Sequence, residues 1–269
     1  MDYDKAIQIK PDYHEAWHNR GVALGELKQY QEAIASYDKA IQIKPDKHEA
    51  WTGRGIALRK LEQYQEAIAS YDKAIQFKPD KHEAWTGRGI ALEELKQYQE
   101  EIASYDKAIQ FKPDFHEAWY NRGAALGELQ RYDEEIASYD KAIQFKPDFQ
   151  EAWYNRGVAL GELQRYDEEI ASYDKAIQFK PDKHEAWQNR GNALVALEQY
   201  QEAIASYDKA IQFKPDFHEA WTGRGNALVA LEQYQEAIAS YDKAIQFKPD
   251  FQLAINNRKK LLTPLGRSK

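Results

Sequence analysis

Tryptophan recurs at a fixed interval along this chain of 269 residues. All seven tryptophans lie 34 residues apart, from Trp17 to Trp221, and eight prolines keep the same interval from Pro11 to Pro249. A period of this length is typical of proteins in which one small structural unit is copied and each copy packs only on its neighbours. The interval therefore predicts a repeat array rather than a globular domain with one central core.

Each copy has the pattern of two helices followed by a break. In the copy spanning residues 48–81, apolar or small residues recur along each half at the spacing of one helix face. They are Trp51, Gly55, Leu58 and Leu61 in the first half, and Tyr64, Ala67, Ile68, Tyr71, Ala74 and Ile75 in the second. Pro79 ends the second helix, because proline cannot continue it. Asp46 and Glu49 have the spacing of a capping box at the start of the first helix.

Six residues of this copy carry a resemblance to a known family. Numbered from 1 at His48, they are Trp51 at position 4, Gly55 at 8, Ala67 at 20, Tyr71 at 24, Ala74 at 27 and Pro79 at 32. The pattern resembles the tetratricopeptide repeat, and the resemblance extends from Asp2 to about Leu265. It implies an all-α solenoid of antiparallel helix pairs, stacked into a right-handed superhelix. It also implies a concave groove, lined by the first helices, that holds peptides or partner proteins.

The expected domain is a single solenoid over residues 1–265. It consists of a partial second helix at 1–13, seven full repeats at 14–47, 48–81, 82–115, 116–149, 150–183, 184–217 and 218–251, a capping helix at 252–265, and a tail at 266–269. The large Trp51 and Tyr71 are expected to fill the gaps between the two helices and toward the adjacent unit, with each tryptophan burying on the order of 200 Å². Because the first residues match the end of a second helix, we interpret the sequence as a fragment of a longer array.

Composition excludes several classes of function. The net charge of −7 argues against nucleic acid as a partner, because nucleic-acid binding needs a basic face. The chain contains no cysteine, which rules out disulfides and thiolate metal sites and favours a cytoplasmic location. No apolar run approaches the roughly 18 residues that span a bilayer, so no membrane partner is expected. We predict no cofactor and no enzymatic activity.

The copies differ mainly on one face of their first helix. Positions 5, 9 and 12 share one side of a helix, and position 6 also varies. The resemblance places this face in the groove, so it predicts a surface that selects a partner. The candidate partner-binding residues are Tyr120, Tyr154, Asn121, Asn155, Asn189, Asn192, Asn226, Thr52, Thr86 and Gln188. The alternatives are neutral variation at solvent-facing sites and tyrosines that only cover their neighbours.

The constant charged positions suggest further expectations. Position 2 is glutamate in every repeat, from Glu15 to Glu219, which favours a neutral or basic peptide over an acidic one, although these glutamates can equally be helix caps. Position 7 is always arginine, and we predict a ladder of ion pairs with the aspartates of the Asp38 and Asp72 series.

Position 20 departs from the family pattern in three repeats. It is glutamate at Glu101, Glu135 and Glu169, where a small residue is usual. A glutamate there clashes with tight packing unless it reaches solvent or meets an arginine. The pattern of the sequence does not decide between these outcomes.

Two other classes of function are kept as alternatives. A self-assembling array is one, since the first residues lack a polar cap and expose an apolar helix face to another copy. A zinc enzyme is the remote one, because His14 and His18 fit an H-E-x-x-H pattern on a helix. No third ligand is evident in the sequence, so no metal site is predicted.

Overall fold

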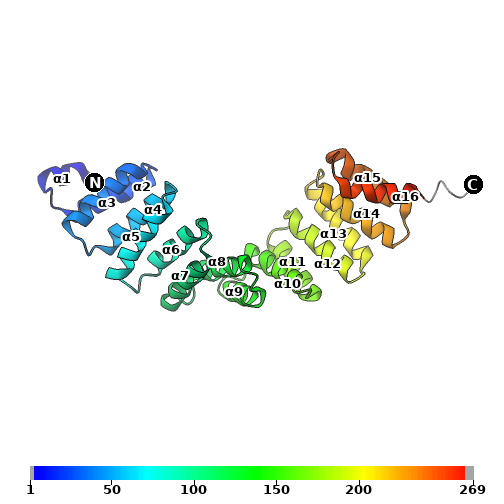
Figure 1. Ribbon diagram of the computed structural model, residues 1–269, viewed down its shortest axis with the longest axis horizontal. Coiled ribbons are helices and arrows are strands. Elements are labelled where there is room, and N and C mark those ends of the chain that lie inside the picture. Colours follow the sequence, from blue (N-terminus) through cyan, green and yellow to red (C-terminus); the bar gives the residue numbers. More distant parts are fainter. Residues whose placement is uncertain (1–2, 264–269) are drawn as a thin grey trace, which may run out of the picture. The chain divides into compact units, whose positions relative to one another are not determined.

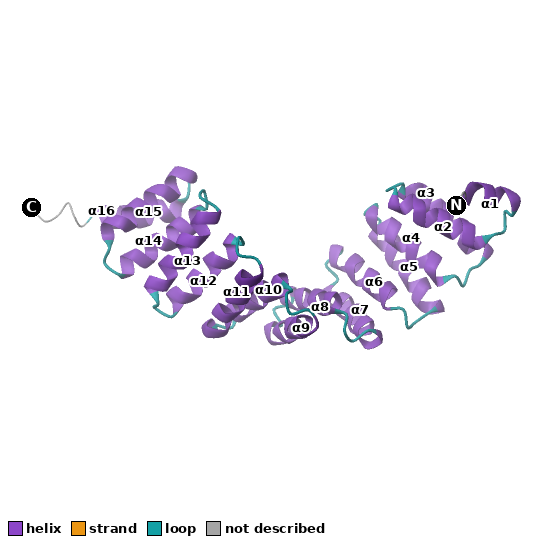
Figure 2. Cartoon of the chain, turned by 180° about the vertical axis from the view of Figure 1, so that it is seen from behind, coloured by secondary structure: helices purple, strands orange, loops and turns teal. Residues whose placement is uncertain are grey.

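The computed structural model describes residues 3–263, and every regular element in this part of the chain is an α-helix (Figures 1 and 2). The helices are α1 (Tyr3–Ile9), α2 (His14–Glu26), α3 (Tyr30–Ile43), α4 (His48–Lys60), α5 (Tyr64–Phe77), α6 (His82–Glu94), α7 (Tyr98–Phe111), α8 (His116–Glu128), α9 (Tyr132–Phe145), α10 (Gln150–Glu162), α11 (Tyr166–Phe179), α12 (His184–Ala196), α13 (Tyr200–Phe213), α14 (His218–Ala230), α15 (Tyr234–Phe247) and α16 (Gln252–Leu262). The prediction of two helices per repeat is confirmed.

The chain forms two compact units, one ending at Arg131 and the other beginning at Tyr132. Within each unit, each first helix packs on the second helix that precedes it, and α2, α4, α6, α10, α12 and α14 also pack on the second helix of their own repeat. The single domain expected over residues 1–265 stays a prediction. The expected tail at 266–269 and the last residues of the expected capping helix lie outside the described part of the chain.

Tyrosine at position 24, rather than tryptophan at position 4, fills the core of each repeat. Tyr71 has no exposed surface, and the alanines beside it on α5, Ala67 and Ala74, are also buried. Trp51 is only half-buried, and its indole Nε1 donates a hydrogen bond to the carbonyl of Pro45 at 2.8 Å. The tryptophans at this position still pack against the core, as Trp17, Trp187 and Trp221 do, but they are less deeply buried than the tyrosine. The indole of Trp51 ties the first helix to the preceding loop.

The buried tyrosine explains the glycine at position 8. A Cβ atom on Gly55 would lie 2.8 Å from the Tyr71 ring, closer than real side chains approach. A Cβ on Gly87, in the first helix of the next repeat, would lie 2.5 Å from the same ring. The ring is thus held between two helix backbones, which can approach closely only because glycine has no side chain.

The capping-box prediction was wrong. The residue that precedes α4 is Lys47, and no side chain caps the helix by a hydrogen bond. The Glu49 carboxylate instead lies 3.4 Å from the Nε2 atom of His48. Burial alone would raise the pKa of Glu49, but a hydrogen bond from its own backbone N–H and the nearby His48 and Lys47 lower it.

The turn between the two helices of a repeat uses a left-handed residue that is never glycine. Glu62 has a φ of 61°, and the same position in the other repeats has a positive φ as well. The Glu62 N–H donates to the Arg59 carbonyl and the Gln63 N–H to the Leu58 carbonyl, each at 3.0 Å. This is the hydrogen-bond pattern of a Schellman motif, which satisfies the last carbonyls of the helix.

The predicted ladder of arginine–aspartate pairs is confirmed. Arg54 Nε donates to the Oδ1 atom of Asp38, on the preceding second helix, at 2.7 Å, and its Nη1 donates to the Oγ atom of Ser70, on the following one, at 2.7 Å. Ser70 in turn donates to the Glu66 carbonyl. The ion pairs are Arg20–Asp4, Arg54–Asp38, Arg88–Asp72, Arg122–Asp106, Arg156–Asp140, Arg190–Asp174, Arg224–Asp208 and Arg258–Asp242.

Candidate functional site

A cavity of about 580 Å³ lies over the first helices of the first unit. Its lining includes His18 and Thr52 at position 5, Val22 and Ile56 at position 9, and Gly25 at position 12. These residues come from α2 and α4, which are neighbours in the stack. The face on which the copies differ therefore lines a hollow large enough for side chains of a bound segment.

The shape of this cavity follows from small residues. A Cβ on Gly25 would meet no atom within 4 Å, so the space above α2 at this point is open. Tyr37 also lines the cavity, and its ring lies 5.7 Å from the ring of His18. The lining thus combines apolar and aromatic surface with a few polar groups, which is the usual make-up of a binding site.

The charged groups of the cavity are nearly balanced. Glu26, Glu49 and Glu83 line it together with Lys60 and Lys81. Burial, and then the positive charge of Lys47, lower the pKa of His18, which favours the neutral form of its imidazole. The lining therefore carries a slight excess of negative charge.

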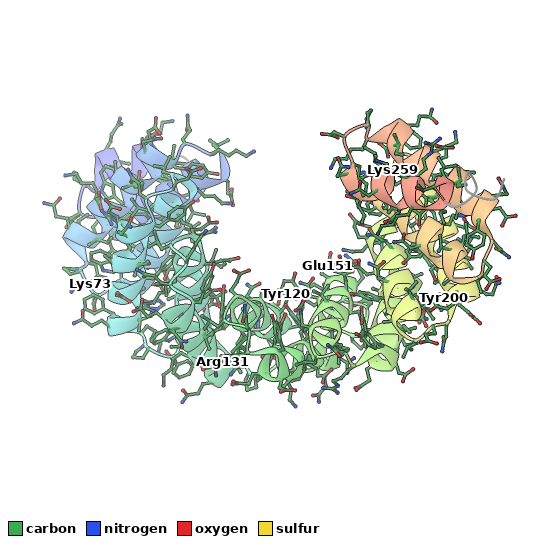
Figure 3. All side chains as sticks on the ribbon, turned by 45° about the vertical axis from the view of Figure 1, so that its right-hand side comes forward. Lys73, Tyr120, Arg131, Glu151, Tyr200 and Lys259 are labelled. Carbon is green, nitrogen blue, oxygen red and sulfur yellow. The ribbon has the colours of Figure 1, made fainter. Side chains whose placement is uncertain are left out.

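The other predicted residues of the first unit lie on three different helices. Thr52 on α4 and Thr86 on α6 are half-buried, and their hydroxyls donate to the carbonyls of His48 and His82, four residues earlier on the same helix. Tyr120, labelled in Figure 3, is half-buried on α8. Asn121 follows it on α8 and approaches the hydroxyl of Tyr105, where it opposes the rise in the pKa of Tyr105 that burial causes.

In the second unit, Tyr154 lies at the centre of a small cluster. Its hydroxyl accepts a hydrogen bond from Asn189 Nδ2 at 3.1 Å, and Lys183 Nζ lies 4.2 Å from the centre of its ring. Its ring is 5.8 Å from that of Tyr173. Burial raises the pKa of Tyr154. The structure thus brings two of the candidate residues, Tyr154 and Asn189, into contact with each other, with the Lys183 ammonium group over the tyrosine ring.

The remaining candidates of the second unit are Asn155, Gln188, Asn192 and Asn226. Asn155 and Gln188 are half-buried on α10 and α12. Asn192 accepts a hydrogen bond from Tyr207 at 2.8 Å, and Asn226 accepts one from Tyr241 at 2.8 Å. In both asparagines the amide oxygen thus already has a partner within the repeat.

The link between the asparagines and the buried tyrosines was not predicted from the sequence. Position 6 holds glycine where the preceding tyrosine packs against the helix backbone, as Gly223 does against Tyr207. It holds asparagine where the amide approaches the tyrosine hydroxyl, as Asn189 approaches Tyr173. The signal was present in the sequence, because position 6 is either glycine or asparagine in all seven repeats, while position 24 of the preceding repeat is always tyrosine.

The glutamates at position 20 are buried in the structure. The exposed fraction is 1% for Glu101, 7% for Glu135 and 6% for Glu169. Glu169 lies against Gly161, where an added Cβ would be 3.1 Å from the carboxyl group, so the glycine makes room for it. Burial is the main cause that raises the pKa of Glu169 to about 7 and that of Glu101 to about 8. Neither carboxylate reaches solvent or forms an ion pair with an arginine of the described chain.

No metal centre is found in the described part of the chain. Among residues 3–263, no group of three or more histidine, cysteine, aspartate or glutamate side chains is arranged to hold a metal ion. His14, the first residue of the zinc-like pattern, instead has its Nε2 atom 3.1 Å from the Glu15 carboxylate.

Comparison with family models identifies the chain. Models described as tetratricopeptide repeat match residues 14–47, 52–114, 104–137, 150–183, 172–205 and 218–251, and one described as TPR repeat matches residues 128–164 and 191–231. Together they span nearly all of the predicted repeats. The chain belongs to the tetratricopeptide repeat family. A comparison with curated proteins gives no significant match.

Solved tetratricopeptide structures share the fold. The C-terminal part of a TPR repeat-containing protein from Cytophaga hutchinsonii is 18% identical with a TM-score of 0.75, and the match covers 89% of this chain and 98% of that one. YrrB, described as a TPR protein with an unusual peptide-binding site, is 21% identical with a TM-score of 0.65, covering 71% of this chain and 99% of that one. MamA from Desulfovibrio magneticus RS-1 is 19% identical with a TM-score of 0.60, and the match covers 64% of this chain and 97% of that one.

Within the described residues, no helix is both long and apolar enough to cross a bilayer.

Proposed function

We propose that this protein is a non-enzymatic, cytoplasmic scaffold that holds a peptide or protein segment on the first helices of its repeats. The observation that carries the proposal is the cavity over α2 and α4. Positions 5, 9 and 12, where the repeats differ, contribute His18, Thr52, Val22, Ile56 and Gly25 to its lining, beside constant residues such as Tyr37 and Glu49. A structure in which the packing is constant and only the open face varies is suited to selecting partners.

The chemistry of the lining favours a neutral or basic segment. Apolar contact comes from Val22 and Ile56, and the three glutamates outnumber the two lysines. An acidic segment would bring like charges together in a partly enclosed site, which costs binding energy. The peptide-binding site named for YrrB supports the class of ligand. Tyr120 and Tyr154 are proposed as further anchors, each within its own unit, because tyrosine gives a large contact area.

Blocking the cavity tests the proposal. Peptides are selected from a random-sequence display library on the wild-type chain, and their affinity is then measured for Gly25→Trp and Gly25→Ala. The indole of Gly25→Trp extends into open space, so we expect at least tenfold weaker binding with an unchanged circular dichroism spectrum. Gly25→Ala adds a methyl group that meets no atom, and it should bind like the wild type.

Two results contradict the proposal. One is that Gly25→Trp binds the selected peptides as tightly as Gly25→Ala does. The other is that the wild-type chain selects no peptides above background.

Self-assembly is the alternative function. Light scattering over a concentration series tests it directly, because the measured mass of a self-assembling array rises with concentration.

A further inference from the structure

A second cavity in the first unit has a different chemistry. It encloses about 310 Å³ between α6, α7 and α8, helices that follow one another in the stack (Figure 1). Ala124 and Ala125 of α8 form the apolar part of its lining. The other residues that line it are Glu93, Glu94, Lys96, Tyr98, Glu101 and Glu128. Four carboxyl groups from three helices thus face one small space.

Glu101 gives this cavity a feature that an acidic cluster alone lacks. Its side chain is 1% exposed, yet its Oε2 atom has no hydrogen-bond partner in the described chain. A buried carboxyl oxygen without a hydrogen-bond partner is costly to the folded protein, and native structures normally avoid it. Because Glu101 also lines the cavity, a donor placed there by a ligand would satisfy this oxygen.

The groups around Glu101 indicate the charge of that ligand. Burial, together with Glu93 on α6 and Glu128 on α8, raises the pKa of Glu101 to about 8. Tyr98 donates a hydrogen bond to Glu128 Oε2 at 3.1 Å, and Lys96 is the basic residue of the lining. No ion pair joins any of the four carboxylates to a basic side chain in residues 3–263. A second positive charge would relieve the repulsion among them.

We propose that this cavity takes the cationic end of a lysine or arginine side chain from a bound segment. The ammonium or guanidinium group donates to the unpaired Oε2 atom of Glu101 and pairs with Glu93 and Glu128, while the methylene chain packs on Ala124 and Ala125. The inference rests on the proposed scaffold function and adds a specific requirement to it. A partner must carry a basic residue where its backbone passes α6 and α8.

Nuclear magnetic resonance titration of the full chain tests this assignment. The probe is acetyl-Gly-Lys-Gly-amide, and its matched control is acetyl-Gly-norleucine-Gly-amide, which has the same chain length without the charge. We expect the lysine peptide to shift the backbone amides of Glu101 and Ala124 in a saturable way, and the norleucine peptide to leave them in place. The arginine peptide should behave like the lysine peptide.

Variants localise the effect. Glu101→Ala places at position 20 the residue that other repeats carry there, so it should fold, and it should weaken lysine-peptide binding at least fivefold. Glu93→Gln/Glu128→Gln should weaken binding similarly while keeping side-chain size. Glu169→Ala removes the same residue type at the same position of the second unit, outside the cavity, and should bind like the wild type.

Several outcomes would overturn the assignment. Equal shifts from the norleucine peptide would show that charge is not recognised. Equal loss in Glu169→Ala and Glu101→Ala would show a general effect on stability. Saturation by 1,4-diaminobutane or calcium chloride, with no response to the lysine peptide, would show a site for small cations instead. Gly25→Trp separates the two proposals, since it blocks the larger cavity and should leave the lysine-peptide shifts unchanged.

Discussion

Glu101 and Glu169 occupy the same position of two repeats, one in each unit, and differ in what faces them. Glu169 faces Gly161, whose missing side chain leaves room for the carboxyl group. Glu101 has the longer Glu93 at the corresponding place, and both residues line a cavity. The pKa is raised to about 7 in the first case and to about 8 in the second. The two sites thus differ at position 12, which is Gly161 beside the packed Glu169 and Glu93 beside the cavity that Glu101 lines.

The largest effect is expected when the second unit is made to resemble the first. Gly161→Glu places a side chain where a Cβ already lies 3.1 Å from the Glu169 carboxyl group. Overpacking and like charge should together lower the free energy of unfolding by about 1–3 kcal/mol at pH 8. Urea denaturation measures the loss.

Gly161→Gln is the control, because it has nearly the same volume without the charge. At pH 8 it should lose less stability than Gly161→Glu, and the two variants should converge near pH 5, where Glu169 is protonated. Equal losses for both variants at every pH would mean that volume alone distinguishes the two sites.

A smaller effect is expected from neutralising the buried glutamate of the first unit. The folded-state pKa of Glu101, about 8, exceeds the ordinary value of 4.5, so the folded chain holds this proton more tightly than the unfolded chain. The resulting stability is complete below pH 4.5 and is lost as the pH rises through 8. Relative to Glu101→Gln, the wild type should therefore lose stability between pH 5 and pH 9.

Thermal unfolding at both pH values measures that difference. The wild type should also lose stability relative to Glu169→Gln between pH 5 and pH 9, but by less, because the pKa of Glu169 is raised less. A wild-type Tm that moves in parallel with the Tm of Glu101→Gln from pH 5 to pH 9 would contradict the burial of a protonated carboxyl group.

The smallest effect should be equal in the two regions. Lys96 and Gln164 each follow the first helix of their repeat and have a φ of 56°, a conformation that costs energy for any residue except glycine. Lys96→Gly and Gln164→Gly should each change stability by a similar amount, about 0.5–1 kcal/mol in favour of the variant, because glycine relieves that strain. Chemical denaturation of both variants should agree within error. Unequal gains would mean that the turns also differ between the regions.

The parts of the fold that repeat were predictable from the sequence. The helix boundaries and the arginine–aspartate ladder depend on spacings that recur in every copy, such as the 16 residues between Asp38 and Arg54. The sequence did not show that Tyr71 is buried more deeply than Trp51, because size alone does not decide which aromatic ring enters the core. Tyr71 packs against Gly55 and Gly87, which lie on the first helices of two successive repeats, so the contact involves more than one repeat.

The cavity around Glu101 could not be found from the sequence for a related reason. Its carboxyl groups come from positions 12, 13 and 20 of one repeat and position 13 of the next, and no single helix face contains all of them. The sequence marked Glu101 as unusual without showing what surrounded it. Part of the lining of the larger cavity was easier to predict, since Thr52 and Ile56 are four residues apart and share one face of a helix.

The arginine ladder has a consequence for how such a chain can change its length. Arg54 reaches 16 residues back to Asp38 and 16 forward to Ser70, and the other arginines for which both contacts are seen have the same reach. Removing or adding any block of 34 residues therefore brings an equivalent aspartate and an equivalent serine to the new junction. A gene that gains or loses whole copies by unequal recombination would encode junctions that are already compatible, so array length can vary before any residue has to adapt.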